Sequence, residues 1–185
     1  MRTPRTVFLS GPAGSGKTTI LRLSHEEKLA LWGRTAAIDT DHLFLMVDPL
    51  WDLPYDDART ALVLRQCVSL VESFFGADYE NVLIAGNSIH DAIDLNPVIP
   101  DLLRLGRVFH VSLDPSEAAV LRRTAGDLDR SPAHLINDLH LLRAKRPPWS
   151  APVDNSTLNP LETLQEIARL VGSGEGELHG PMADV

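Results

Sequence analysis

Short apolar runs alternate with longer amphipathic stretches over residues 1–171 of the chain. The apolar runs predict buried strands at 6–10, 35–38, 81–85 and 107–113, and Val153 indicates a short fifth strand. Apolar residues spaced three and four apart predict a helix over 58–76. Similar patterns predict helices over 17–32, 97–105, 116–124 (with Asp114 as its cap) and 161–171. Because strands that alternate with helices form βαβ units, we expect an α/β fold with three layers and a parallel sheet of about five strands.

Residues 172–185 follow neither pattern. They contain four glycines and few apolar residues. We therefore expect one domain over 1–171 and an unstructured tail over 172–185. The full length of 185 residues, with 44% hydrophobic and 23% charged residues, is typical of one globular domain.

Charge and cysteine content exclude several classes of protein. The chain carries 17 Lys and Arg against 25 Asp and Glu, a net charge of −8. This excess of negative charge argues against a nucleic-acid face and against an anionic membrane surface. Cys67 is the single cysteine, so an internal disulfide is excluded, and no apolar run reaches the roughly 20 residues of a membrane helix. We expect a cytoplasmic protein, and the sequence leaves open whether it is a monomer or a homodimer.

The turn after the first predicted strand carries the strongest chemical signal. Residues 11–18, GPAGSGKT, match the phosphate-binding pattern G-x-x-x-x-G-K-[ST] at every position. Glycines let successive N–H groups face phosphate oxygens, and the following helix adds its positive end. We expect Lys17 to contact the β- and γ-phosphates and the Thr18 hydroxyl to bind Mg²⁺. The pattern thus predicts a site for ATP and Mg²⁺ formed by Gly11, Gly14, Ser15, Gly16, Lys17, Thr18 and Thr19.

Two aspartates, Asp39 and Asp41, follow the second predicted strand. Ligands of open α/β sheets bind at the carboxyl ends of the strands, so we expect both aspartates near the phosphate loop. One can hold Mg²⁺ while the other accepts a proton from an attacking hydroxyl, and the sequence leaves the order open. The alternative is a polar strand end in which Asp41 caps a helix that begins at His42.

An arginine-bearing segment follows the fourth predicted strand and its helix. Arg123 and Arg130 belong to a stretch with Gly, Asp, Ser and Pro that interrupts the helical pattern. Such a segment is typical of a mobile lid, here over 123–138, which excludes water and brings cations to a transferring phosphoryl group. The alternative is a solvated surface loop.

These motifs together resemble the P-loop small-molecule kinases, most closely the shikimate kinases, over residues 7–171. The resemblance implies a P-loop NTPase fold of the nucleotide-kinase and shikimate-kinase type, with a lid. It implies that Asp39 serves Mg²⁺ and that Asp41 contacts substrate hydroxyls. It also implies that Arg123 packs on adenine, that Arg130 touches the phosphates and that Asn159 lies in the loop next to adenine.

The resemblance further implies an acceptor site. Arg65 and Arg146 occupy the places of carboxylate-binding arginines, and Gly86 and Asn87 stand at a strand end that faces the substrate. Gly86-Asn87-Ser88 replaces the three glycines of that family, and its amide and hydroxyl groups suit a polyol, a sugar, a natural product or a nucleotide. A natural product would resemble the acceptor of chloramphenicol phosphotransferase-like enzymes.

We therefore expect an enzyme that moves the γ-phosphoryl group of ATP to a hydroxyl of a small molecule. Lys17, Asp39, Asp41 and Arg130 are its candidate catalytic residues. Two alternatives stay open: a nucleotide or nucleoside kinase, and an NTP-binding switch that hydrolyses slowly and signals to a partner.

Overall fold

The computed structural model describes residues 3–50, 57–86, 97–126 and 130–180, and all structural statements concern these residues. Five parallel strands form an open sheet in the order β2-β3-β1-β4-β5. A sixth strand pairs antiparallel with β4. The strands are β1 (Arg5–Ser10), β2 (Thr35–Asp39), β3 (Asn81–Ala85), β4 (Arg107–Leu113), β5 (Ala151–Val153) and β6 (Glu177–Leu178). The predicted parallel sheet of about five strands is confirmed.

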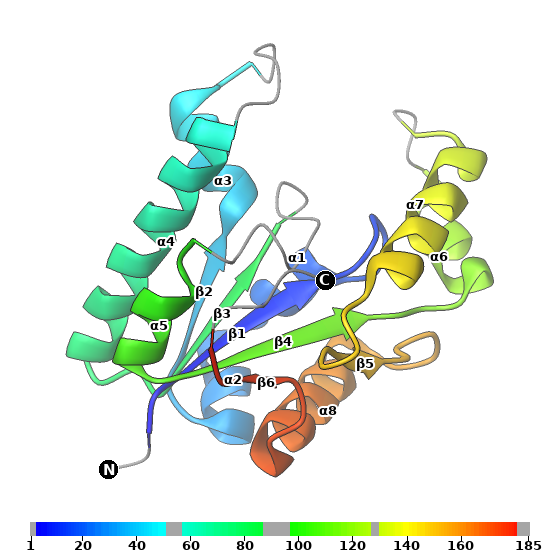
Figure 1. The fold of residues 1–185 in the computed structure, drawn as a ribbon. Coiled ribbons are helices and arrows are strands. Elements are labelled where there is room, and N and C mark those ends of the chain that lie inside the picture. Colours follow the sequence, from blue (N-terminus) through cyan, green and yellow to red (C-terminus); the bar gives the residue numbers. More distant parts are fainter. Residues whose placement is uncertain (1–2, 51–56, 87–96, 127–129, 181–185) are drawn as a thin grey trace.

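Helices cover both faces of this sheet (Figure 1). They are α1 (Lys17–Leu21), α2 (His25–Trp32), α3 (Thr40–Val47), α4 (Asp57–Gly76), α5 (Ile99–Leu105), α6 (Glu117–Arg123), α7 (Pro132–Lys145) and α8 (Pro160–Ser173). One buried cluster joins α1, α2 and α8 to Val7, Leu83 and Phe109 of the sheet. A second cluster joins α4 and α5 to Phe8 and Ile84, which point to the opposite face. The fold therefore has the three layers that the alternation of elements predicts.

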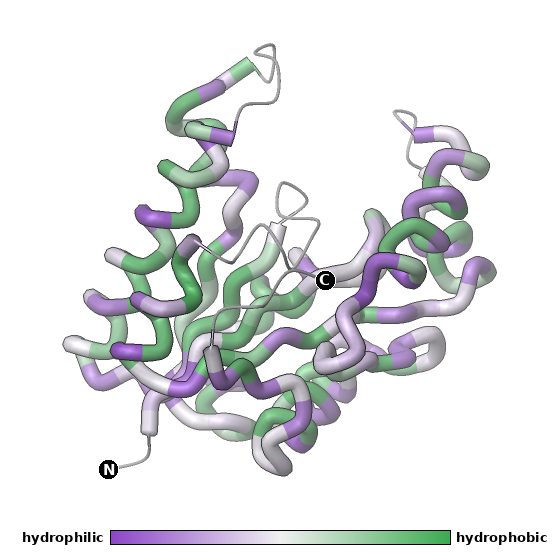
Figure 2. Tube along the Cα trace, viewed as in Figure 1, coloured by the Kyte–Doolittle hydropathy of each residue, from purple (hydrophilic) through white to green (hydrophobic). Residues whose placement is uncertain are grey.

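Apolar residues lie along the strands and polar residues along the outer helix faces, as the hydropathy colouring of Figure 2 shows. β1 is central, and its Val7 is in register with Leu83 of β3 and with Phe109 of β4. All three of these side chains are fully buried. Buried parallel strands of this kind are nearly continuous apolar runs, which explains why the sequence pattern identifies them.

Two pairs of helices lie on opposite sides of the carboxyl ends of the central strands. The pair α3 and α4 is on one side, and the pair α6 and α7 is on the other (Figure 1). The second pair has a small core of its own, formed by Val120, Leu135 and Leu139. The phosphate loop at the end of β1 lies between these two pairs. No described helix combines the length and the apolar character that a bilayer-spanning segment needs.

Two predicted helices differ in the structure. The helix predicted over 17–32 is divided into α1 and α2, because Ser24 starts a second helix. The Ser24 hydroxyl accepts a hydrogen bond from the Glu27 N–H (3.1 Å), and the Glu27 carboxylate accepts one from the Ser24 N–H (2.7 Å). The helix predicted from 116 begins at Glu117, and its cap is Ser116 and not Asp114.

The C-terminal segment also differs from the predicted unstructured tail. α8 continues to Ser173, and Gly174 ends it with a left-handed φ of 88°. β6 then pairs Leu178 with Val108, and the Glu177 carboxylate accepts two hydrogen bonds from Arg107 at 2.6 and 2.5 Å. The partners of β6 lie about 70 residues earlier in the chain, so no local pattern indicates this strand. Residues 181–185 lie outside the described part of the chain.

Candidate functional site

The phosphate loop connects β1 to α1 and depends on three glycines. Gly11, Gly14 and Gly16 have φ values of 144°, 77° and 100°, a region that side chains rarely adopt. At Gly14 an added Cβ would lie 2.6 Å from Thr124 of α6, and at Gly11 it would lie 2.9 Å from the Leu113 carbonyl oxygen. The loop therefore packs directly against the end of β4 and against α6. This packing fixes the positions of its N–H groups.

Lys17 is buried beneath this loop, with 5% of its surface exposed. Its Nζ donates hydrogen bonds to the carbonyl oxygens of Gly11 (2.5 Å) and Pro12 (3.2 Å). Burial lowers the pKa of Lys17 to about 8. The charges of Asp41, Arg130 and Asp39 all act on this ammonium group, the two carboxylates raising its pKa and the guanidinium lowering it. Four of the residues that the sequence singles out are thus within electrostatic range of one another.

A hollow of about 520 Å³ opens on the outer side of the loop. This volume lies in the range of small-molecule and cofactor sites. The loop lines one wall, and Arg123 and Arg130 line another. Its lining includes Gly14, Gly16, Lys17, Thr18, Thr19, Arg123, Arg130, Asn155, Leu158 and Pro160. Six of the nine residues predicted to contact the nucleotide therefore line one space, and Gly11, Ser15 and Asn159 do not line it.

Arg123 and Asn155 hold the phosphate loop from the side of this hollow. The Ser15 carbonyl oxygen accepts hydrogen bonds from Asn155 Nδ2 (2.8 Å) and from Arg123 Nη1 (3.4 Å). Arg123 Nη2 also donates to the Asn155 carbonyl oxygen at 2.5 Å. Asn155 is only 2% exposed. It belongs to the loop that the resemblance places next to adenine, in which Asn159 and not Asn155 is the predicted contact. The feature of the sequence that could have identified Asn155 is an amide side chain two residues after the short strand β5.

Asn159 lies in the loop between β5 and α8, but its side chain does not line the hollow. Its side chain accepts a hydrogen bond from the Glu162 N–H (2.9 Å) and caps α8, and Asn159 itself is exposed. The neighbouring Leu158 and Pro160 line the hollow instead. The loop between β5 and α8 therefore reaches the nucleotide side of the site, while the Asn159 side chain is used to start the helix.

The acidic pair lies at the carboxyl end of β2. Asp39 Oδ1 accepts a hydrogen bond from the Asp41 N–H (3.1 Å), so Asp39 caps α3. The alternative in which Asp41 caps a helix from His42 is wrong, because α3 begins at Thr40. Gly86, at the end of β3, lies directly beside this turn. An added Cβ there would overlap Thr40 Oγ1 and lie 2.8 Å from Asp41 Oδ1. Asn87 lies outside the described residues.

The residues around the loop suit Mg²⁺ better than a metal held by protein groups alone. No group of three or more His, Cys, Asp and Glu side chains gathers for a metal in the described ranges. Mg²⁺ typically needs only one or two carboxylates and takes its other ligands from phosphates and water. The Thr18 hydroxyl, which lines the hollow, and the Asp39 carboxylate at the end of β2, whose charge acts on Lys17, are groups of this kind.

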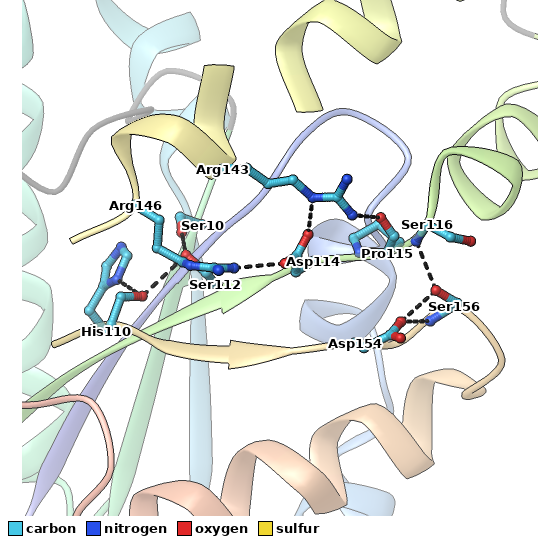
Figure 3. Close-up of polar contacts among 11 residues, drawn as sticks. Ser10, His110, Ser112, Asp114, Pro115, Ser116, Arg143, Arg146, Asp154 and Ser156 are labelled. Carbon is cyan, nitrogen blue, oxygen red and sulfur yellow. Dashed lines mark hydrogen bonds and ion pairs between the residues drawn. The ribbon is translucent and has the colours of Figure 1, made fainter. Parts of the chain in front are cut away.

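The two predicted acceptor arginines lie apart. Arg65 is an exposed residue of α4 and does not line the hollow beside the phosphate loop. Arg146 follows α7 and donates from Nη1 to Asp114 Oδ2 at 2.7 Å. Arg143 Nε donates to the other oxygen, Asp114 Oδ1, at 2.6 Å (Figure 3). Burial raises the pKa of Asp114, but the hydrogen bonds from Arg143 and Arg146 outweigh it and hold this pKa below its usual range.

A chain of buried polar groups continues from this cluster along β4. The Ser112 hydroxyl lies 2.8 Å from the Ser10 hydroxyl and 3.2 Å from the Ser150 hydroxyl (Figure 3). His110 Nδ1 lies 2.7 Å from Ser150 Oγ. Burial lowers the pKa of His110 to about 4, so its ring is neutral at physiological pH. A second, much smaller hollow of about 20 Å³ lies between this chain, Arg146 and the start of the phosphate loop.

Comparison with known proteins supports this fold. No protein-family model matches the chain, and no curated protein matches it significantly. Among solved structures, shikimate kinase from Acinetobacter baumannii in complex with shikimate has a TM-score of 0.62 and 22% identity, covering 94% of this chain and 96% of that one. A gluconokinase from Sinorhizobium meliloti 1021 has a TM-score of 0.61 and 16% identity, covering 95% of each chain. The Deinococcus radiodurans tunicamycin resistance protein has a TM-score of 0.60 and 17% identity, covering 98% of this chain and 100% of that one.

A further match is to a longer protein. A chain of the Pnkp1/Rnl/Hen1 RNA repair complex matches with a TM-score of 0.56 and 15% identity. The match covers 79% of this chain but 46% of that chain. The chain therefore has the P-loop kinase fold, as its motifs predict, and at these identities the comparisons establish the fold alone.

Proposed function

We propose that this chain is a kinase that transfers the γ-phosphoryl group of ATP to a hydroxyl of a small molecule. The observation that carries the proposal is the convergence of Asp39, Asp41 and Arg130 on the buried ammonium of Lys17, beside a hollow of nucleotide size. A loop that only binds phosphate has no need of two carboxylates at this point. A carboxylate beside the phosphates is useful when an acceptor hydroxyl must lose its proton.

The loop and Lys17 bind the phosphates in this proposal. The N–H groups of the loop and the Lys17 ammonium hold the β- and γ-phosphates, and Arg123 packs on the adenine. Thr18 and Asp39 would hold Mg²⁺, which supplies positive charge that neutralises the phosphate oxygens. The second oxygen of Asp39 is the one available for this role, because Oδ1 caps α3.

Asp41 accepts the proton of the attacking hydroxyl. Its charge has the largest of the three effects on Lys17, the residue proposed to hold the γ-phosphate, and this supports the assignment. Arg130 then neutralises the charge that develops on the phosphoryl oxygens as the segment 123–138 closes over the nucleotide. The reaction forms an O–P bond to the acceptor and breaks the bond between the γ-phosphorus and the bridging oxygen, which leaves as part of ADP.

The acceptor belongs to the class of polyols, sugars or hydroxylated natural products. The similar structures include a shikimate kinase, a gluconokinase and a sugar kinase, and these names support a hydroxyl acceptor. The similar structures also include a tunicamycin resistance protein, and its name supports a natural product as a further kind of acceptor. We propose that Gly86, which packs against Thr40 and Asp41 with no room for a side chain, contributes its backbone to the acceptor site.

ADP formation measured over a panel of polyols, sugars, shikimate and nucleosides tests the proposal. We expect formation that depends on one class of hydroxyl compound, with a loss of kcat of about a hundredfold or more in Asp41→Asn while ATP still binds. Asp101→Asn is the matched control, because that carboxylate is 53% exposed on α5 and pairs only with nearby Arg104 at 2.7 Å among the contacts described.

The outcomes separate the candidate functions. Stimulation by nucleosides alone assigns a nucleoside kinase. Slow ADP formation that no acceptor changes assigns an NTP-binding switch, and it contradicts the proposed transfer. An Asp41→Asn variant as active as the control would remove Asp41 from the proton-accepting role.

A further inference from the structure

The loop between β5 and α8 forms the part of the large hollow that suits a nucleoside. Leu158 and Pro160 of this loop line the hollow and are partly buried. Their apolar surface suits the flat face of a nucleobase, whereas the N–H groups of residues 11–18 suit phosphates. The hollow therefore has a nucleoside end and a phosphate end.

Asn155 connects this loop to the phosphate loop. Its Nδ2 donates to the Ser15 carbonyl oxygen at 2.8 Å, and a Cβ added at Gly16 would lie 3.7 Å from the same Nδ2. The amide thus lies against the two residues that precede Lys17. The peptide bond between Ser15 and Gly16 is planar and trans, so its C=O and N–H groups point in opposite directions. Because Asn155 holds the C=O group, it also fixes the direction of the Gly16 N–H, one of the groups expected to face the phosphates.

Helix α6 holds both this connection and the loop that carries Asn155. Arg123 Nη1 donates to the same phosphate-loop carbonyl oxygen at 3.4 Å, and Arg123 Nη2 donates to the Asn155 carbonyl oxygen at 2.5 Å. Arg122 Nη2 donates to the Ser156 carbonyl oxygen at 3.0 Å. The Ser116 N–H, at the start of α6, donates to Ser156 Oγ at 2.8 Å (Figure 3). The two loops are therefore joined to each other and to one helix.

The connection is buried, but its hydrogen bonds are incomplete. Ser15 is fully buried, and Asn155 is 2% exposed. In the part of the chain that the structure describes, four buried side-chain atoms lack a hydrogen-bond partner, and Ser15 Oγ and Asn155 Oδ1 are two of them. Buried polar atoms without partners are rare because each one lowers stability, and proteins retain them mainly at functional sites. This pattern points to a role for Asn155 beyond packing.

We infer that Asn155 is a positioning residue that couples the nucleoside end of the site to its phosphate end. This inference rests on the ATP site of the proposed function. A nucleoside that packs on Leu158 and Pro160 orders the loop after β5, and the hydrogen bond from Asn155 passes that order to the peptide group between Ser15 and Gly16. The phosphates then meet a loop that is already arranged, so each half of ATP strengthens the binding of the other half.

Adenosine and magnesium pyrophosphate test the coupling, because together they fill both ends of the hollow without the α-phosphate that links them in ATP. Calorimetry gives the affinity for pyrophosphate with and without saturating adenosine, and the ratio of the two affinities is the coupling factor. We expect a factor of about five or more in the wild type, and the same factor for adenosine when pyrophosphate is saturating. The factor is expected to fall below about two in Asn155→Ala.

Asn81→Ala is the matched control. Asn81 is also a buried asparagine whose Nδ2 donates to a backbone carbonyl oxygen, that of Trp32 at 3.0 Å. It lies at the amino end of β3, whereas the phosphate loop follows the carboxyl end of the neighbouring strand β1. We expect this variant to lose stability and to keep the wild-type coupling factor. Arg123→Lys keeps the charge and loses the two-pronged contact, so it is expected to lower the factor even if Asn155→Ala does not fold.

Several results would overturn the inference. They are a wild-type factor of one, an unchanged factor in folded Asn155→Ala or in Arg123→Lys, and an equal fall in Asn81→Ala, which would make the effect one of stability alone. None of these measurements requires phosphoryl transfer. A protein that binds ATP and shows the coupling but phosphorylates no acceptor would contradict the proposed kinase function and leave this inference standing. Failure of ATP itself to bind would contradict both.

Discussion

Lys17→Met should remove a pH-dependent instability from the nucleotide-free protein. Lys17 is buried, and its pKa falls from 10.5 to about 8. The folded state therefore holds the charged ammonium less well than the unfolded state does. A shift of this size corresponds to about 3 kcal/mol of destabilisation at neutral pH, when Lys17 is charged in both states. ATP binding is expected to offset this destabilisation, because the negative charge of the phosphates stabilises the buried ammonium group.

The sign follows from the direction of the shift. Below pH 8 the penalty is fully present. As the pH rises from 8 toward 10.5, Lys17 is neutral in the folded protein and still protonated in the unfolded chain, so stability rises. Between pH 7 and pH 9.5 this group alone adds about 2 kcal/mol to the unfolding free energy of the wild type. Lys17→Met lacks that contribution.

Urea unfolding of both proteins at pH 7 and pH 9.5 measures the effect. The stability of the variant relative to the wild type is expected to fall by about 2 kcal/mol over this interval. Taking the difference between the unfolding free energies of the two proteins cancels the contribution from the titration of all other groups. It also cancels the lost hydrogen bonds to Gly11 and Pro12, to the extent that they do not depend on pH. If the difference in unfolding free energy between the two proteins stays constant with pH, the lowered pKa of the buried Lys17 is refuted.

Three further substitutions test other parts of the site. Gly86→Ala is expected to cost about 1–3 kcal/mol in urea unfolding, because its Cβ would overlap Thr40, and an unchanged midpoint would contradict this packing. Asn155→Ala removes the hydrogen bond to the phosphate loop and should cost about 1 kcal/mol while weakening ATP binding in a fluorescence titration; unaltered affinity would exclude a positioning role. Glu177→Gln should cost about 1 kcal/mol near neutral pH. Hydrogen bonds from Arg107 lower the pKa of Glu177 in the folded protein. The stabilisation by the Glu177 carboxylate is therefore present above pH 4.5 and is lost as the pH falls through the lowered pKa of the folded state. A cost of the substitution that persists in acid would argue against the ion pair.

Local patterns were sufficient for the sheet and for the phosphate loop. The strands at 81–85 and 107–113 are almost entirely buried, and their apolar residues Val82 to Ala85 and Val108, Phe109, Val111 and Leu113 make them visible in the sequence. The 20-residue helix α4 is long, and its buried residues Val63, Leu64, Cys67 and Val71 follow the helical spacing of three and four, which makes its period easy to identify. The eight-residue motif at 11–18 lies between the strand β1 and the helix α1, as the motif requires.

Those local patterns do not predict contacts between residues that are far apart in the chain. Asp114 was expected to cap a helix, but Ser116 does so, and Asp114 binds two arginines 29 and 32 residues away. The sequence predicts a lid over 123–138 and does not predict helix α7. Only Leu135 and Leu139 of this helix are buried, so its apolar pattern is weak. Ser131 caps α7 and Pro132 begins it, a signal that was present in the sequence and was interpreted only as a break.

The fate of the γ-phosphoryl group tests the central claim most directly. We would follow ³¹P spectra of the wild-type protein with ATP, Mg²⁺ and the stimulating acceptor from the panel. The account predicts a new phosphate monoester that grows in equal amount to ADP and is absent with Asp41→Asn. Growth of inorganic phosphate in place of the ester would contradict transfer to a hydroxyl.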